Sequence, residues 1–296
     1  MLKVLVLGGS GLVGSTFFEY AKDSFDIHLT YNKNSLNFSH QDSTHLDLIN
    51  QPKLLNELIL QYAPDVVINT IAHSSVDHCE INHEDADLLH LTRVIDILKA
   101  SEQIGSRVIH FSTDAVFPGE LNKKYTENDM PNPINYYGKT KLKSEKLVLE
   151  FSSKNTVLRT SVVYGSHHRS RFTQWILPYL KNKKTVDPFI DQFNTPTLVN
   201  DLAKSLTQII DKNIFGLFHA SGSTCINRYD FALLLAKKFR YDSKLIKPVT
   251  SKEKKQIAPR PISTCLDSTK LETILGFKFS DLNSGISYLY KNNFIN

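Results

Sequence analysis

A tyrosine and a lysine four residues apart, Tyr137 and Lys141, form the pair whose chemistry is easiest to name. Residues i and i+4 of a helix share one face, so the phenol and the ammonium would be neighbours there. A nearby cation stabilises phenolate and lowers the tyrosine pKa, which suits general acid–base work. Ser112 and Thr113 end an earlier apolar run, where a hydroxyl could hold a carbonyl oxygen beside the tyrosine. These residues indicate a site for carbonyl chemistry.

A glycine-rich turn directly after the first apolar run is the second pattern that indicates chemistry. Glycine lets the backbone turn tightly and approach a pyrophosphate, whose charge then lies at the N-terminus of the following helix. The position of the turn, between a predicted strand and a predicted helix, is the one that dinucleotide binding requires. The predicted dinucleotide-binding residues here are Gly8, Ser10, Gly11, Leu12, Val13 and Gly14.

The residues after the second apolar run bear on which dinucleotide binds. Sites for NAD usually place an acid about 20 residues beyond the glycines, where it binds the ribose 2′-hydroxyl. This chain has Tyr31, Asn32 and Lys33 there, with no acid. Because Lys33 could pair with a 2′-phosphate, the sequence favours NADP(H). A solvated loop lysine is the alternative, so NAD(H) stays open.

The elements that must position these residues alternate along the first two-thirds of the chain. Nearly continuous apolar runs predict strands covered by helices on both faces, and longer amphipathic segments predict the helices. The predicted strands are 3–7, 26–31, 65–71, 107–112 and 156–163, and the predicted helices are 12–22, 52–62, 84–102 and 136–151. This alternation predicts a Rossmann-like α/β fold, a doubly wound parallel sheet with right-handed crossovers.

The alternation weakens after residue 165, and the chain of 296 residues is long for one hydrophobic core. We therefore expect a smaller C-terminal α/β substrate lobe. The predicted dinucleotide-binding domain is 1–165, rejoined by about 190–220, and the predicted lobe is 166–190 with 221–296. Helices are expected around Trp175, at 200–211 and at 229–239, with a strand at 217–219.

Composition excludes several classes of protein. Hydrophobic residues make up 41% and charged residues 22%, which is ordinary for a globular chain. No apolar stretch approaches the roughly 18 residues of a membrane helix, so no membrane partner is expected. The net charge of +5 is a mild bias toward anionic ligands and far from a nucleic-acid-binding signature.

Cysteines and histidines give no metal or disulfide pattern. Cys79, Cys225 and Cys265 are widely spaced and odd in number, which predicts no disulfide framework and favours a reducing cytoplasm. His83 and Glu84 begin a zinc-helix pattern, but the next required position holds Asp87. We therefore expect no metal.

Motifs in a fixed order along the chain resemble the dTDP-4-dehydrorhamnose reductase branch of the extended short-chain dehydrogenases/reductases. The matching segments are the glycine turn, 64–69, 76–80, 112–117, 137–142, 158–161, 191–193, 196–197, 260–261 and 266–267. The resemblance implies NAD(P)H-dependent reduction of the 4-keto group of a nucleotide-linked 6-deoxy sugar. It therefore implies a nucleotide-diphosphate sugar as partner, and a homodimer stays open.

The resemblance also implies roles for single residues. Tyr137 would give its proton to the nascent alkoxide, Lys141 would hold the nicotinamide ribose and lower the Tyr137 pKa, and Thr113 would orient the carbonyl. The further cofactor-lining residues that it implies are Asp47, Leu48, Ala72, His73 and Ser112. The predicted substrate site consists of Thr113, Asp114, Ala115, Val162 and Arg260, the last as a partner for phosphate.

Two departures from the family pattern leave the sugar open. Family members typically carry an aromatic residue where this chain has Ala115 and a tryptophan where it has Val162, so the pocket would be wider here. Segments 216–222 and 266–272 also resemble the regulatory β subunit of methionine adenosyltransferase, a non-catalytic relative. A cofactor-binding regulatory subunit is therefore one alternative, and a nucleotide-sugar epimerase or dehydratase is another.

Overall fold

A seven-stranded sheet forms the centre of the computed structural model, which describes residues 1–33 and 43–293. Its order is β10-β6-β5-β4-β1-β2-β3, and all neighbouring strands are parallel. The strands are β1 (Lys3–Leu7), β2 (Asp26–Tyr31), β3 (Ser43–His45), β4 (Val66–Asn69), β5 (Arg107–Thr113), β6 (Thr156–Thr160) and β10 (Gly216–His219). This order confirms the predicted Rossmann-like α/β fold, and it reverses direction at β1, where such sheets bind ligands.

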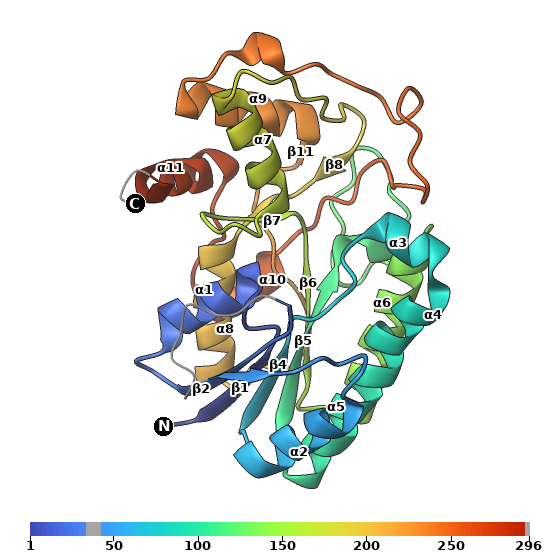
Figure 1. The fold of residues 1–296 in the computed structure, drawn as a ribbon, viewed down its shortest axis with the longest axis vertical. Coiled ribbons are helices and arrows are strands. Elements are labelled where there is room, and N and C mark those ends of the chain that lie inside the picture. Colours follow the sequence, from blue (N-terminus) through green and yellow to red (C-terminus); the bar gives the residue numbers. More distant parts are fainter. Residues whose placement is uncertain (34–42, 294–296) are drawn as a thin grey trace.

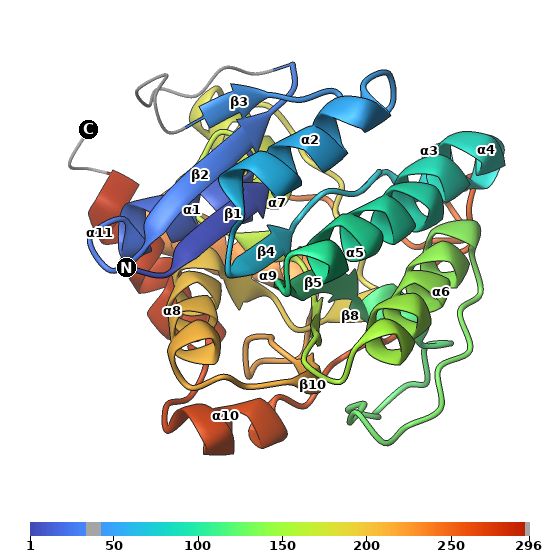
Figure 2. The ribbon, with the colours of Figure 1, turned by 90° about the horizontal axis from the view of Figure 1, so that it is seen from below.

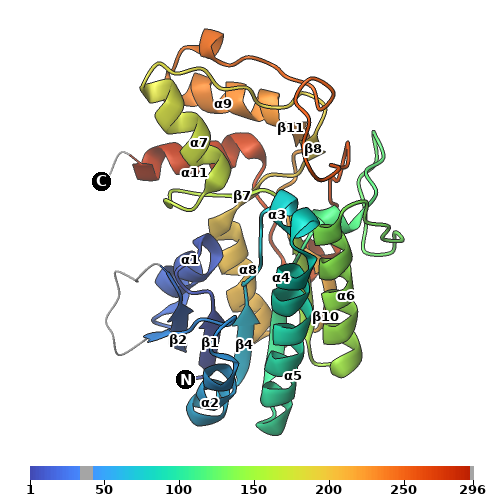
Figure 3. The same ribbon diagram turned by 45° about the vertical axis from the view of Figure 1, so that its right-hand side comes forward.

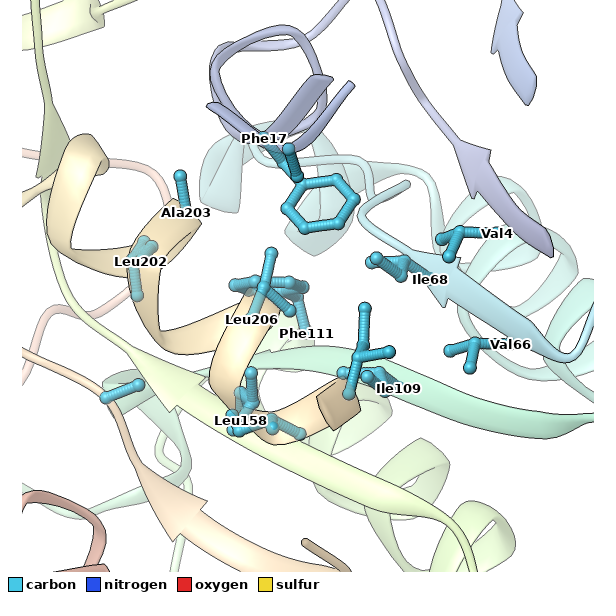
Figure 4. Packing of buried hydrophobic residues seen from close by; sticks show 14 of the residues in the cluster. Val4, Phe17, Val66, Ile68, Ile109, Phe111, Leu158, Leu202, Ala203 and Leu206 are labelled. Carbon is cyan, nitrogen blue, oxygen red and sulfur yellow. The ribbon is translucent and has the colours of Figure 1, made fainter. Parts of the chain in front are cut away.

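Helices cover both faces of the sheet (Figures 2 and 3). One face carries α1 (Leu12–Ala21) and α8 (Val199–Asp211), and the other carries α2 (Pro52–Tyr62), α5 (Arg93–Gln103) and α6 (Tyr136–Phe151). Each layer buries its own core. Phe17 of α1 and Leu206 of α8 pack with Phe111 of β5, as Figure 4 shows. Two-sided burial explains why the strand sequences are apolar without alternation.

Two predicted elements are interrupted in the structure. The expected helix 84–102 consists of α4 (His83–Asp87), a π-helical turn η2 (Leu88–Thr92) and α5. The expected strand 156–163 breaks after β6, because Val162 adopts a φ of 41° before β7 (Val163–Tyr164) begins. Left-handed backbone is costly for a β-branched residue, and such strain is typically found at functional sites.

A second group of helices lies beyond the carboxyl ends of the strands, at the top of Figure 1. It comprises α7 (Arg171–Lys181), α9 (Arg228–Phe239) and α11 (Leu282–Asn293), with the short strands β8 (Phe193–Asn194), β9 (Thr197–Leu198) and β11 (Ile226–Asn227). These helices share a core that includes Ile176 and Phe231. By contrast, α10 (Thr269–Leu275) packs Leu271 and Leu275 into the core of the sheet.

The remaining short helices are α3 (Val76–Ile81), η3 (Asp114–Val116) and η4 (Ser243–Leu245). None of the helices within the described residues is long and apolar enough to cross a membrane.

One cysteine prediction is wrong. Cys225 and Cys265 form a disulfide, although they are 40 residues apart in sequence, because both β11 and the segment around Ser263 pair with β8. Cys79 is a buried free thiol. The cysteine pattern therefore does not support a reducing compartment.

Candidate active site

A cleft of about 1310 Å³ lies between the carboxyl edge of the sheet and the upper helices. Sites for one small molecule typically measure about 300–1,000 Å³, so this cleft has room for a dinucleotide and a second ligand. The predicted site residues that line it are Gly8, Ser10, Gly11, Leu12, Val13, Tyr31, Asn32, Lys33, Asp47, Leu48, Ala72, His73, Ser112, Thr113, Asp114, Ala115, Tyr137, Val162 and Arg260. Among the described residues, the predicted Gly14 and Lys141 are outside the lining.

The glycine turn fits a pyrophosphate. Gly8 has a φ of 88°, and a Cβ there would lie 2.6 Å from the Thr70 hydroxyl oxygen. Helix α1 starts after Gly11, which provides no side-chain cap, and its first turn has no acidic residue. The first amide groups of α1 are therefore available to an anion, as in dinucleotide sites. Gly14 packs against this turn instead of lining the cleft, since a Cβ on it would lie 2.7 Å from the carbonyl oxygen of Gly8.

Polar residues border the cleft at the ends of β2 and β3. Lys33 is exposed there, beside Asn32, and β2 ends without an acid, as a site for a 2′-phosphate requires. Asp47 is engaged by its own turn, since its carboxylate accepts hydrogen bonds from the Ile49 amide and the Asn50 side chain. These hydrogen bonds, led by that of Asn50, lower the Asp47 pKa. Asp47 therefore shapes the edge of the cleft.

Tyr137 lies in the first turn of α6, deep in the cleft. The Asn135 side chain caps this helix by accepting a hydrogen bond of 2.8 Å from the Gly138 amide. Gly138 packs against the carbonyl of Ala115, where a Cβ would clash, so the turn lies directly on the segment that follows β5. This close approach places the Tyr137 phenol near the Thr113 hydroxyl, within reach of a hydrogen bond. The predicted tyrosine and threonine are thus brought together.

Burial dominates the titration of Tyr137. It raises the Tyr137 pKa to about 12, and the hydrogen bond with Thr113 and the charge of Arg171 oppose it only in part. The prediction that Lys141 lowers this pKa is wrong for this structure. The phenol is therefore fully protonated at neutral pH, the state of a proton donor.

Lys141 points away from the cleft, into the layer between α6 and the sheet. Its ammonium donates to the Phe111 carbonyl at 2.7 Å and lies 3.0 Å from Nε2 of His110. Burial lowers the Lys141 pKa to about 8, with the charge of Glu145 acting in the opposite direction. Burial and the same lysine hold the His110 pKa well below its usual range. The i,i+4 spacing predicted the shared helix but not this side-chain direction.

Asp114 has a structural role, since its carboxylate accepts hydrogen bonds from several segments of the chain. Its Oδ2 accepts hydrogen bonds of 2.7, 2.8 and 2.6 Å from Ser161, Asn194 and Thr264. The Thr113 hydroxyl donates to its other oxygen at 3.1 Å. Asp114 lines the cleft as predicted, yet these donors occupy its carboxylate and tie the end of β5 to the upper segments.

The pocket wall near Ala115 and Val162 contains aromatic residues that the sequence did not assign to the site. Phe172 and Trp175 of α7 line the cleft, with ring centroids 6.0 Å apart. Both also pack in the core of the upper helices. Because α7 lies over the cleft, these rings also line the cleft in addition to packing in the core.

Four arginines line the cleft, Arg169 and the three whose partners follow. Arg260 donates to the Asp77 carboxylate at 3.0 Å and to the Ala258 carbonyl, and its side chain is 18% exposed. Arg171 donates to the Ser74 carbonyl. Arg228, which sequence reasoning missed, donates to the Asn194 side chain at 3.1 Å. No motif surrounds Arg228, so only the fold could identify it.

Comparisons with known proteins agree with this geometry. The family described as RmlD substrate binding domain matches residues 2–294. A dTDP-4-dehydrorhamnose reductase of Aggregatibacter actinomycetemcomitans is 31% identical, with 95% of this chain and 96% of that protein aligned. A crystal structure titled as a hypothetical dTDP-4-dehydrorhamnose reductase from Sulfolobus tokodaii is 32% identical, with a TM-score of 0.84 and coverage of 96% and 99%.

A relative with another role is similar over nearly the same length. Methionine adenosyltransferase 2 subunit beta of Bos taurus is 29% identical, and the alignment covers 92% of this chain and 82% of that protein. The family match extends over almost all described residues, including the glycine turn, Thr113 and Tyr137. The chain therefore belongs to the RmlD substrate-binding domain family.

Proposed function

We propose that this chain is an NAD(P)H-dependent reductase of a nucleotide-linked 4-keto-6-deoxy sugar. The observation that carries the proposal is one continuous cleft that holds Tyr137 near Thr113 and has the glycine turn at its other end. A dinucleotide on that turn and a keto sugar beside the phenol would occupy one continuous space. The name of the Aggregatibacter relative supports the same substrate class, with thymidine diphosphate as the nucleotide.

The residues of the chain would divide the reaction as follows. When bound, NAD(P)H supplies the hydride for the carbonyl carbon. The Tyr137 hydroxyl donates its proton to the carbonyl oxygen, and Thr113 holds that oxygen through its own hydroxyl. Because an alkoxide is more basic than a phenolate, a phenol with a pKa of about 12 still transfers its proton favourably. The high pKa therefore suits the direction of reduction.

Lys141 keeps its proposed role at the nicotinamide ribose, on one condition. Its ammonium, which lies beneath the cleft, must break its hydrogen bond with the Phe111 carbonyl and donate to the nicotinamide ribose instead. A lysine with a pKa of about 8 is mostly charged at neutral pH and can make that exchange as a cation.

Organisation and location complete the proposal. The dinucleotide-binding part is residues 1–165 with about 190–220, and the substrate lobe is 166–190 with 221–296, except that α10 of the latter segment packs on the sheet. We also propose a cytoplasmic location and a homodimer, both of which rest on the type of substrate and the family. Ala115 and Val162 line the cleft together with Phe172 and Trp175, and their small side chains, where the family typically has aromatic rings, support a sugar other than the rhamnose precursor.

One assay tests the proposed activity. Purified protein is mixed with NADPH and a panel of nucleotide-linked 4-keto-6-deoxy sugars, and absorbance of the reduced nicotinamide is followed. We expect oxidation with at least one sugar. Saturable NADPH binding without oxidation of any sugar would contradict the reductase and favour the regulatory role of the Bos taurus relative.

A further inference from the structure

Three potential metal ligands from separate segments meet beside the cleft. His73 follows β4, His78 lies in α3 and Asp85 lies in α4. One ligand atom of each can be chosen so that all three lie within 4.8 Å of one another. The sequence pattern tested only His83 and the residues after it, whereas the fold assembles a different set.

The distances fit a small divalent ion. Nε2 of His78 lies 3.3 Å from Oδ2 of Asp85. Two ligands about 2.0–2.1 Å from a tetrahedral ion are separated by roughly 3.3–3.4 Å, so this pair already has the required spacing. The His73 and His78 rings lie 4.9 Å apart and are tilted by 39°, so that their edges can face a common point. Small side-chain rotations would bring the third ligand into place.

Buried imidazole nitrogens are the second observation. Nε2 of His73 and Nε2 of His78 are both buried and have no hydrogen bond among the described residues, and the Asp85 carboxylate lies 3.3 Å from the second of them. Buried polar atoms without partners are rare in folded proteins and call for an explanation. A bound cation would satisfy both nitrogens at once, since unprotonated imidazole is a common metal ligand.

The surroundings can hold the ligands in place. Nε2 of His90 accepts a hydrogen bond of 2.9 Å from the His73 amide, which fixes the backbone of that residue. The exposed Asn82 side chain lies 3.2 Å from Nδ1 of His78. If its amide turns to present oxygen, Asn82 accepts from Nδ1 and leaves Nε2 free for the ion, the usual arrangement around a metal-bound histidine.

We propose that His73, His78 and Asp85 bind a divalent transition-metal ion of the zinc type. Two imidazoles and one carboxylate suit Zn²⁺, and also Co²⁺ and Ni²⁺, better than Mg²⁺ or Ca²⁺. A cavity of about 350 Å³ lined by residues 81–85 adjoins Asp85 and gives water access to the remaining coordination position. The ion would tie the segment after β4, whose His73 also lines the cleft, to α3 and α4.

Metal titration of the chelator-treated full chain tests this site. We expect one Zn²⁺ per chain by calorimetry, Co²⁺ absorption bands typical of mixed nitrogen and oxygen ligands, and a Tm increase of about 3 °C or more with Zn²⁺. His78→Ala and Asp85→Asn should each weaken the binding at least about tenfold. Asp85→Asn keeps the shape of the side chain, so it tests the ligand without a large change in packing.

His83→Ala is the matched control. His83 lies in the same helix as Asp85, but its ring stacks on Tyr136 at 3.6 Å and is outside the ligand set. This variant should keep the affinity and the Co²⁺ spectrum. The proposal is overturned by the absence of stoichiometric binding, by unchanged binding in both ligand variants, or by loss of binding in His83→Ala.

Discussion

The Thr264 hydroxyl donates a hydrogen bond of 2.6 Å to the Asp114 carboxylate, across 150 residues of sequence. Asn194 donates to the same oxygen from β8, and Ser161 donates from the end of β6. The buried Asp114 carboxylate thus connects three segments on the substrate side of the cleft through hydrogen bonds. The geometry of the pocket therefore depends on Asp114, although this residue need not take part in the reaction.

Asp114→Asn tests this connection. The amide replaces one carboxylate oxygen by a donor, so either the three donors to Oδ2 or the Thr113 hydroxyl, which donates to Oδ1, lose their acceptor. We expect the free energy of unfolding to fall by about 2–3 kcal/mol and KM for the sugar to rise. Denaturant unfolding and steady-state kinetics measure both. Asp23→Asn, at an exposed position, should change stability by no more than about 0.5 kcal/mol. Equal stability of the two variants would contradict the connecting role.

Gly138→Ala tests the contact that positions Tyr137. A Cβ at residue 138 clashes with the Ala115 carbonyl and must push α6 away from β5. A displacement of about 1 Å can cost roughly 100-fold in rate, so kcat should fall by that order while NADPH still binds. Lys139→Ala, one residue later on the exposed side, should keep kcat. A normal rate in Gly138→Ala would show that this close approach is not required.

The buried Lys141 makes stability depend on pH. Its folded pKa of about 8 is below the usual lysine value of 10.5, so the folded chain binds fewer protons than the unfolded chain between these pH values. The cost of burying the ammonium is full below about pH 8 and is relieved as pH rises toward 10.5. Lys141→Met should therefore raise the free energy of unfolding, relative to the wild type, more near pH 7 than at pH 10.

Urea unfolding at pH 7 and pH 9.5 measures the difference. Lys143→Met is the matched control, because Lys143 is exposed on the same helix and should give the same stability difference at both pH values. If the stability differences of Lys141→Met and Lys143→Met change equally with pH, burial does not destabilise the Lys141 ammonium.

Cofactor preference provides a separate prediction. If Lys33 pairs with a 2′-phosphate, Lys33→Ala should weaken NADPH binding by about tenfold and NADH binding much less. Fluorescence titration with both dinucleotides measures the two affinities. Lys53→Ala, an exposed lysine of α2, should leave both unchanged. Equal losses for NADPH and NADH in Lys33→Ala would refute the 2′-phosphate contact.

The sequence predicted what depends on local pattern. Apolar runs and the glycine turn led to the parallel sheet with helices on both faces and to one end of the cleft, because strand burial and helix N-termini follow from neighbouring residues. Tyr137 and Thr113 were found through their places at a helix start and a strand end. The bend at Val162 was missed, since a left-handed valine leaves no trace in a run of apolar residues.

Long-range geometry accounts for the other differences. The i,i+4 rule placed Lys141 on the helix face of Tyr137, but the buried Phe111 carbonyl decides where its ammonium lies. The donors to Asp114 come from three distant segments, and Cys225 meets Cys265 only after those segments fold together. Such contacts depend on tertiary packing, which spacing alone does not encode.

Proton donation by Tyr137 is the central claim, and Tyr137→Phe tests it most directly. The variant removes the hydroxyl and keeps the ring. We expect single-turnover reduction of the accepted keto sugar to slow by a factor of about 100–10,000, while the NADPH dissociation constant changes less than about twofold. A variant that reduces the sugar at the wild-type rate would contradict the account, because the proton would then come from another group.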